Sequence, residues 1–226
     1  MTYALFGCPR SGTNLLSSLL KHSDGSAFQV EPFSMSVPWV LRDDLYRLPA
    51  NELALRCRCR ACYVCELRDA CRSGLVSFKE TALFEYLDIL GDDFGVERVV
   101  YLERPRQQVV ESYAKHELWH RWHLADRRLA RESLPLLTDM DTAAMSRAYG
   151  EVATDLKRAY WRRYAPGFCV MDVSFEDLTR RPADTVGAVL DFLGRKPLPY
   201  LEALIERKFQ EGEAGHVYAT FPNDLR

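Results

Sequence analysis

YALFGCPRSGTNLLSSLL, residues 3–20, is the stretch that decides the fold of this chain. It begins with an apolar run of strand length, continues through turn residues, and ends with apolar residues at helical spacing. Gly7 and Gly12 allow the turn to bend with its backbone amides facing inward, and the N-terminus of the following helix adds further N–H groups. This order of strand, turn and helix predicts a phosphate loop whose ligand is a phosphorylated nucleotide.

The loop is a variant of the one found in nucleotide hydrolases. There, a Gly-Lys-Ser/Thr ending places a lysine on the phosphates and a hydroxyl on magnesium. Here residues 9–13 read PRSGT, so an arginine supplies the positive charge. The pattern G-x-P-R-S-G-T-x-L-L, residues 7–16, resembles the 5′-phosphosulfate loop of sulfotransferases that use 3′-phosphoadenosine 5′-phosphosulfate (PAPS).

This resemblance, to the carbohydrate and glycolipid type of sulfotransferase, implies an α/β fold: a P-loop NTPase-like three-layer sandwich with a mainly parallel central sheet. It also implies that the loop holds the 5′-phosphosulfate and stabilises charge on the bridging oxygen as the bond to sulfur breaks. In this role Arg10 is a catalytic as well as a binding residue. The loop residues expected to bind the donor are Arg10, Ser11, Gly12, Thr13 and Asn14.

A second segment, residues 103–112, resembles the same family. It follows an apolar strand and reads ERPRQQVVES, in which Arg104 precedes Ser112 by eight residues, as in the family's 3′-phosphate motif. A guanidinium fork with a hydroxyl on the next helix suits a terminal phosphate. The family's common form has proline two residues after the arginine, whereas here it is the next residue, so either Arg104 or Arg106 can hold the 3′-phosphate.

Glu31-Pro32 follows a short predicted strand, residues 27–30. Proline turns the chain, which places the Glu31 carboxylate at a strand end, where ligands bind in parallel sheets. A carboxylate there can take the proton of an acceptor hydroxyl. Sulfotransferases acting on sugars have a glutamate at about this distance from the loop, so the resemblance implies that Glu31 is the catalytic base. His120 and His123 are the alternative bases, and a solvated turn carboxylate is the alternative for Glu31.

Three further segments bear on the fold and the acceptor. The acidic turn at residues 172–178, with a proline and a helix that stops at Gly194, resembles the family's Y-E-D-L turn and F-L-G helix end. Lys79, after the predicted strand at 75–78, resembles a lysine that many family members carry there; a surface lysine is the alternative. Residues 116–131 are rich in tryptophan and arginine and suit either an acceptor wall or an amphipathic lid helix.

Composition bounds the classes of protein. The 226 residues are 47% hydrophobic and 27% charged, which suits one domain over residues 1–226, with a cysteine-rich insertion at about residues 50–75. A net charge of −2 and a pI of about 6.2 argue against a general binder of nucleic acid or anionic membranes. A first strand at about residue 3 leaves no room for a signal peptide, and no apolar run has the length of a membrane span. We therefore expect a cytoplasmic protein.

Five of the seven cysteines lie within fifteen residues. In a chain without a secretory signal, clustered cysteines are more typical of metal ligands than of disulfides. Zinc held by four thiolates is the favoured interpretation; disulfides or free thiols, and an iron–sulfur cluster, are the alternatives. The zinc ligands are expected to be four of Cys57, Cys59, Cys62, Cys65 and Cys71.

Together these patterns predict a sulfotransferase that moves the sulfuryl group of PAPS to a hydroxyl or amine of an acceptor, a carbohydrate or another small molecule. Adenosine 3′,5′-bisphosphate would be the product. Two other functions fit part of the sequence. One is a P-loop kinase using ATP and magnesium, and the other is a non-catalytic protein that senses a nucleotide or a metal.

The cysteine cluster yields a first testable prediction. If residues 57–71 hold structural zinc, elemental analysis of the purified protein should find about one zinc ion per chain, since four thiolates complete one tetrahedral site. Chelation should loosen this segment and leave the phosphate loop formed. A brown protein that contains iron would contradict zinc and indicate an iron–sulfur cluster. The absence of both metal and free thiols would indicate disulfides.

Overall fold

The computed structural model describes residues 2–24, 28–30, 69, 71–74, 77–81, 87–116, 142–196 and 199–213. In this part of the chain the centre is a five-stranded sheet in the order β2-β3-β1-β4-β5, in which every neighbouring pair is parallel. This confirms the predicted α/β, P-loop-like architecture. The strands are β1 (Thr2–Gly7), β2 (Phe28–Val30), β3 (Ser77–Glu80), β4 (Val96–Glu103) and β5 (Cys169–Ser174).

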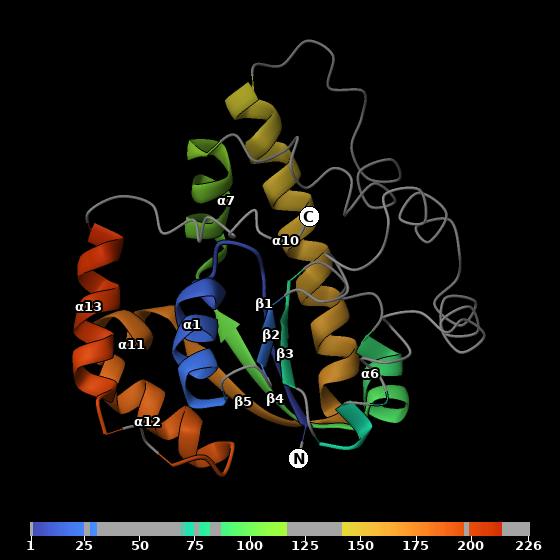
Figure 1. Ribbon diagram of the computed structural model, residues 1–226. Helices are drawn as coiled ribbons and strands as arrows, with labels where there is room; N and C mark the ends of the chain where they lie inside the picture. The colour runs from blue at the N-terminus through green and yellow to red at the C-terminus, as the bar shows by residue number, and fades with distance from the viewer. Residues whose placement is uncertain are drawn as a thin grey trace, which may run out of the picture.

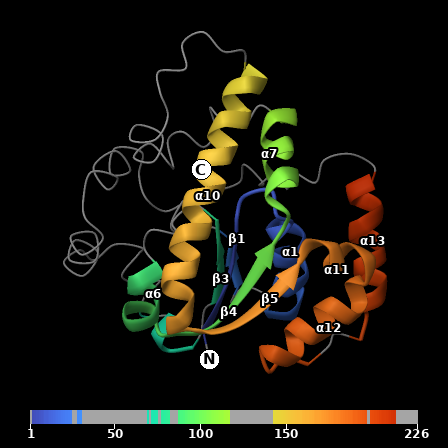
Figure 2. The same ribbon diagram turned by 180° about the vertical axis from the view of Figure 1, so that it is seen from behind.

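Helices cover both faces of the sheet, which makes three layers (Figures 1 and 2). On one face lie α1, α11, α12 and α13, and on the other lie α6 and the long helix α10, with α7 beside α10 at the carboxyl edge of the strands. None of the described helices is long and apolar enough to cross a bilayer. Their bounds are α1 (Thr13–Asp24), α6 (Leu87–Phe94), α7 (Arg106–Lys115), α10 (Thr142–Tyr164), α11 (Phe175–Arg180), α12 (Pro182–Phe192) and α13 (Leu201–Glu213), with a short 3₁₀ turn, η3 (Ala165–Gly167), after α10.

The central strand β1 is buried on both faces, as expected for a parallel sheet between helical layers. Because successive side chains alternate, Tyr3 and Leu5 enter the core beneath α1, α12 and α13, whereas Ala4 and Phe6 enter the core beneath α6 and α10. In the second core Tyr101 of β4 stacks on Trp161 of α10, with ring centroids 4.2 Å apart and planes 8° from parallel. The strand that precedes the phosphate loop is therefore held from both sides.

Strand register brings the functional loops together. Phe6 pairs with Glu80, Gly7 with Leu102, and Glu103 with Ser174, so four strand ends meet at one edge. Ligands bind at this edge in open parallel sheets. The loop after β1 therefore lies beside the ends of β3 and β4.

Two local expectations have different outcomes. The predicted strand at 75–78 corresponds to β3 (Ser77–Glu80), which continues two residues beyond the expected end, so that Lys79 and Glu80 lie inside the strand, where both are buried. The predicted stop at Gly194 is confirmed: its φ is +66°, and the amide of Arg195 donates to the carbonyl oxygen of Leu190 at 2.7 Å. These are features of a helix C-terminus that ends in a left-handed residue.

The contact between α7 and α10 yields a testable prediction on stability. A Cβ at Gly150 of α10 would lie 2.9 Å from Cβ of Tyr113, an atom close to the backbone that cannot move aside cheaply. Gly150→Ala gains about 1 kcal/mol of helix propensity, but overpacking costs about 1–3 kcal/mol. The free energy of unfolding, measured by urea denaturation, should therefore fall.

Gly187 of α12 is the matched control, because a Cβ there meets nothing within 4 Å. Gly187→Ala should raise the free energy of unfolding by about 0.5–1 kcal/mol, since alanine loses less backbone entropy on folding. An increase of the same size for Gly150→Ala would contradict the close packing of α7 on α10.

Candidate functional site

The phosphate loop joins β1 to α1 and contains two residues in the left-handed region. Arg10 has φ +70° and Gly12 has φ +90°, and the amide of Ser11 donates to the carbonyl oxygen of Cys8 at 3.1 Å. For arginine this conformation is uncommon, and strained residues of this kind cluster at ligand sites. Successive amides in such a turn form a concavity that suits an anion.

Close approach makes both glycines of the loop necessary. A Cβ at Gly7 would lie 2.7 Å from the carbonyl oxygen of Leu102 and 2.7 Å from a methyl carbon of Thr13. A Cβ at Gly12 would lie 2.7 Å from the ring of Phe175. The loop is therefore packed directly on β4 and on the first residue of α11.

Arg10, Arg104 and Ser112 meet beside the loop. Nε of Arg10 donates to Oγ of Ser112 at 2.9 Å, and Arg104 donates through Nη1 to the carbonyl oxygen of Arg10 at 2.9 Å. Nε of Arg104 donates to Oε1 of Gln108 on the first turns of α7 at 3.0 Å. Three residues that the sequence placed in two separate phosphate sites are thus in one connected cluster, which we call the arginine cluster.

The arginine cluster concentrates positive charge in a half-buried place. Burial lowers the pKa of Arg104, and the nearby guanidinium of Arg10 lowers it further. The Arg104 guanidinium also lies over the ring of Phe175, 4.3 Å from its centroid. Two cations held this close are stabilised by a bound anion, which would reverse the repulsion between them.

Arg106, the other arginine of the motif, points elsewhere. Its Nε and Nη2 donate to the two carboxylate oxygens of Asp155 on α10 at 2.7 and 2.8 Å. This hydrogen bonding lowers the pKa of Asp155. Between the two candidates for the 3′-phosphate, the geometry therefore favours Arg104.

Lys79 is the third cation near the loop, and it is not a surface lysine. Its side chain is only 2% exposed, and its Nζ donates to Oδ1 of Asn14 in the first turn of α1 at 2.8 Å. A buried ammonium held by a residue of the phosphate loop can add positive charge close to a bound anion. Sequence reasoning noted Lys79 from the family resemblance, but the role of the Asn14 side chain carries no sequence signal.

A cluster of buried polar side chains behind the loop is a second feature that the sequence did not predict. Cys8, Tyr101 and Lys157 are each at most 3% exposed, and the thiol of Cys8 hydrogen bonds with the side chain of Tyr101. Burial raises the pKa of the Cys8 thiol, an effect that the charge of Lys157 opposes. The thiol is therefore neutral, and Cys8 acts as a packing residue of the loop.

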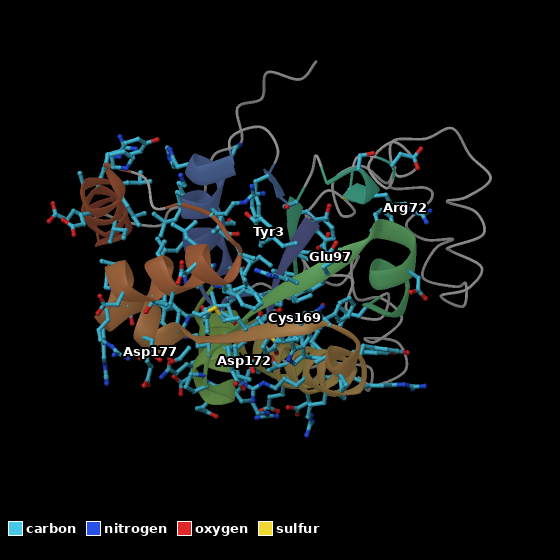
Figure 3. The ribbon with its side chains drawn as sticks, turned by 90° about the horizontal axis from the view of Figure 1, so that it is seen from below. Tyr3, Arg72, Glu97, Cys169, Asp172 and Asp177 are labelled. Carbon is cyan, nitrogen blue, oxygen red and sulfur yellow. The ribbon has the colours of Figure 1, made fainter. Side chains whose placement is uncertain are left out.

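Asp172 resembles in position the metal-holding aspartate of nucleotide hydrolases, and the structure separates it from the loop. It is exposed on β5, like Cys169, and Figure 3 shows both residues on that strand. Because β4 lies between β5 and β1, Asp172 does not adjoin the phosphate loop. It therefore has no part in the arginine cluster.

Several predicted site residues lie outside the described residues: Glu31, His120, His123, Cys57, Cys59, Cys62 and Cys65. Cys71, the remaining cysteine of the cluster, is 1% exposed in the core beneath α6 and α10, and burial raises its pKa to about 12. In the described ranges no group of three or more His, Cys, Asp or Glu is arranged to hold a metal, and zinc on four of the five clustered cysteines stays a prediction.

Comparison with known proteins supports the fold. No protein-family profile and no curated protein sequence match the chain. Among solved structures, the sulfotransferase domain of the Synechococcus PCC 7002 olefin synthase has a TM-score of 0.55 and 16% identity, over 89% of this chain and 76% of that one. The sulfotransferase domain from the curacin biosynthetic pathway has a TM-score of 0.52 and 13% identity, over 88% and 76%. A sulfotransferase from Alicyclobacillus acidocaldarius has a TM-score of 0.50 and 16% identity, over 95% of each chain. The chain thus has the fold of sulfotransferase domains.

Proposed function

We propose that this protein is a PAPS-dependent sulfotransferase that acts on a hydroxyl or amine of a small molecule, such as a carbohydrate. The single observation that carries the proposal is the arginine cluster: Arg10, Arg104 and Ser112 converge beside the phosphate loop. A loop that holds one phosphate group needs no second cationic site at its side. A nucleotide with a 3′-phosphate does need one, and that extra phosphate distinguishes PAPS from ATP.

The residues present fit the two anionic ends of such a donor. The amides of residues 12–14, at the start of α1, bind the 5′-phosphosulfate, because a helix N-terminus carries unpaired N–H groups and a partial positive charge. Lys79 lies near the 5′-phosphosulfate end of the site, because its Nζ donates to Oδ1 of Asn14. Arg104 and Ser112 bind the 3′-phosphate, and Arg10, which contacts both of them, links the two ends.

The chemistry requires one proton transfer and one charge to be stabilised. PAPS supplies a sulfuryl group bound to a phosphate leaving group. The acceptor oxygen or nitrogen attacks sulfur and its proton passes to Glu31, while the sulfur–oxygen bond to the phosphate breaks. Arg10 and Lys79 stabilise the negative charge that develops on the departing phosphate.

A kinase is the second candidate, and two features of the structure disfavour it. The loop lacks the lysine that nucleotide hydrolases place on the phosphates, and Asp172 does not adjoin the loop.

The choice of nucleotide is the direct test. Adenosine 3′,5′-bisphosphate should bind at least about tenfold more tightly than adenosine 5′-monophosphate, because each charge-assisted hydrogen bond to the extra phosphate contributes about 1.5–3 kcal/mol. Isothermal titration calorimetry measures both. Equal affinities would contradict the proposal, and preferential binding of ATP with magnesium would identify a kinase.

Two arginine variants provide a matched pair for the same titrations. Arg104→Ala should abolish most of the preference for the bisphosphate, whereas Arg106→Ala should keep it, because Arg106 is paired with Asp155. The opposite result would place the 3′-phosphate on Arg106.

The predicted base has its own test. Glu31→Gln keeps the size of the side chain and one acceptor oxygen but cannot take a proton at neutral pH. It should bind adenosine 3′,5′-bisphosphate normally and lose sulfuryl transfer by about 10²–10⁴-fold, the usual contribution of a positioned base. Transfer to candidate acceptors is followed by mass spectrometry. Normal transfer would exclude Glu31, and His120→Ala and His123→Ala would then be measured in the same assay.

A further inference from the structure

Phe175, the first residue of α11, lies between the two nucleotide-binding parts of the proposed site. Its ring faces the Arg104 guanidinium at 4.3 Å, and the same ring contacts the backbone of Gly12 so closely that a Cβ there would lie 2.7 Å from it. The residue before Phe175 has an evident structural role. Ser174 caps α11 by accepting from the amides of Glu176 and Asp177, at 3.1 and 3.4 Å, so the backbone that carries the ring is held in place.

The contact with Arg104 leaves the hydrogen-bonding edge of the guanidinium available. A guanidinium that stacks on an aromatic ring uses its flat face, and its five N–H donors lie in its own plane. In the described part of the chain, hydrogen bonds occupy two of these donors, through Gln108 and the carbonyl oxygen of Arg10. None of the described residues occupies the other three donors, which leaves them for a ligand.

Core packing does not account for Phe175. Its neighbours along the chain, Val173 and Leu178, belong to the core beneath α1, α12 and α13. Phe175 is only partly buried and is not among the buried residues of that core. Its ring instead meets the phosphate loop at Gly12 and the guanidinium of Arg104.

We propose that Phe175 is a positioning residue for the 3′-phosphate and acts through Arg104. It holds the guanidinium plane before the ligand binds, with the loop backbone at Gly12 as its second support. The inference rests on the proposed function, because it needs a ligand with a 3′-phosphate. An arginine side chain that is already immobilised does not lose its rotamer freedom on binding, which is equivalent to about a 3- to 10-fold gain in affinity.

The test compares two nucleotides that differ only in the 3′-phosphate. Affinities for adenosine 3′,5′-bisphosphate and adenosine 5′-monophosphate are measured by calorimetry, and their ratio is taken, so that effects on the shared part of the nucleotide cancel. Phe175→Leu removes the aromatic face and should lower this ratio about 3- to 10-fold. Phe175→Tyr keeps the face and should keep the ratio within about twofold of the wild-type value.

A double-mutant cycle shows whether Phe175 acts through Arg104. In an Arg104→Ala background, Phe175→Leu should leave the ratio unchanged within about twofold, because the guanidinium that the ring positions is gone. Arg104→Lys, which keeps the charge but loses the planar group, should likewise make the ratio insensitive to Phe175→Leu. The two Arg104 backgrounds thus test the role of Phe175 without relying on the single variant Phe175→Leu. Thermal unfolding of each variant identifies any that does not fold, and Phe175→Met then replaces Phe175→Leu.

The outcomes separate the inference from the function on which it rests. A wild-type protein with no preference for the bisphosphate overturns both. A wild-type preference that survives Phe175→Leu, or a loss that is equal with and without Arg104, overturns only the positioning role of Phe175. Equal losses for both nucleotides, with an unchanged ratio, would make Phe175 a support of the loop and not of the arginine.

Discussion

The hydrogen bond from Arg104 to the carbonyl oxygen of Arg10 joins the two strand ends on which the site depends. Sheet pairing places Gly7 opposite Leu102, but the chain beyond each of these residues leaves the sheet and needs another constraint. The left-handed conformation of Arg10 presents its carbonyl oxygen to Arg104 at 2.9 Å, and its side chain reaches Ser112 on α7. The loop and the start of α7 are therefore linked twice, and a shift of either would break both bonds.

This link brings positive charges together at a cost. Burial and the nearness of Arg10 both lower the pKa of Arg104, which means that desolvation and repulsion between the two guanidinium groups disfavour the charged form of Arg104. The whole chain has a net charge of −2, so the arginine cluster and Lys79 form a local concentration of positive charge that the overall charge does not reveal. A bound anion with two separated phosphate groups would offset this cost, which is the physical basis of the proposed nucleotide specificity.

Helix α10 packs along α7 and so determines where α7 presents Ser112. Close packing of Gly150 on Tyr113 determines how near the two helices lie, and the Arg106–Asp155 pair ties the start of α7 to the middle of α10. Since that ion pair is exposed, it contributes little to stability. Its effect on the site is to direct Arg106 away from the arginine cluster.

Patterns along the chain were enough to predict the phosphate loop, the strand and helix that flank it, the spacing of Arg104 and Ser112, and the helix stop at Gly194. All of these are local, because turn chemistry, apolar periodicity and helix ends depend on residues close together in the chain. The end of β3, two residues later than expected, shows the limit of such local signals, since strand ends are decided by pairing with a neighbour.

Tertiary structure alone decided which side chains meet. Arg106 found Asp155, 49 residues away, and Lys79 found Asn14, 65 residues away. Phe175 came to lie under Arg104, and Cys71 entered the core, only when the sheet was assembled. The reason is physical: the partner of a charged or aromatic side chain depends on strand order, register and helix packing, and no pattern along the chain encodes these directly.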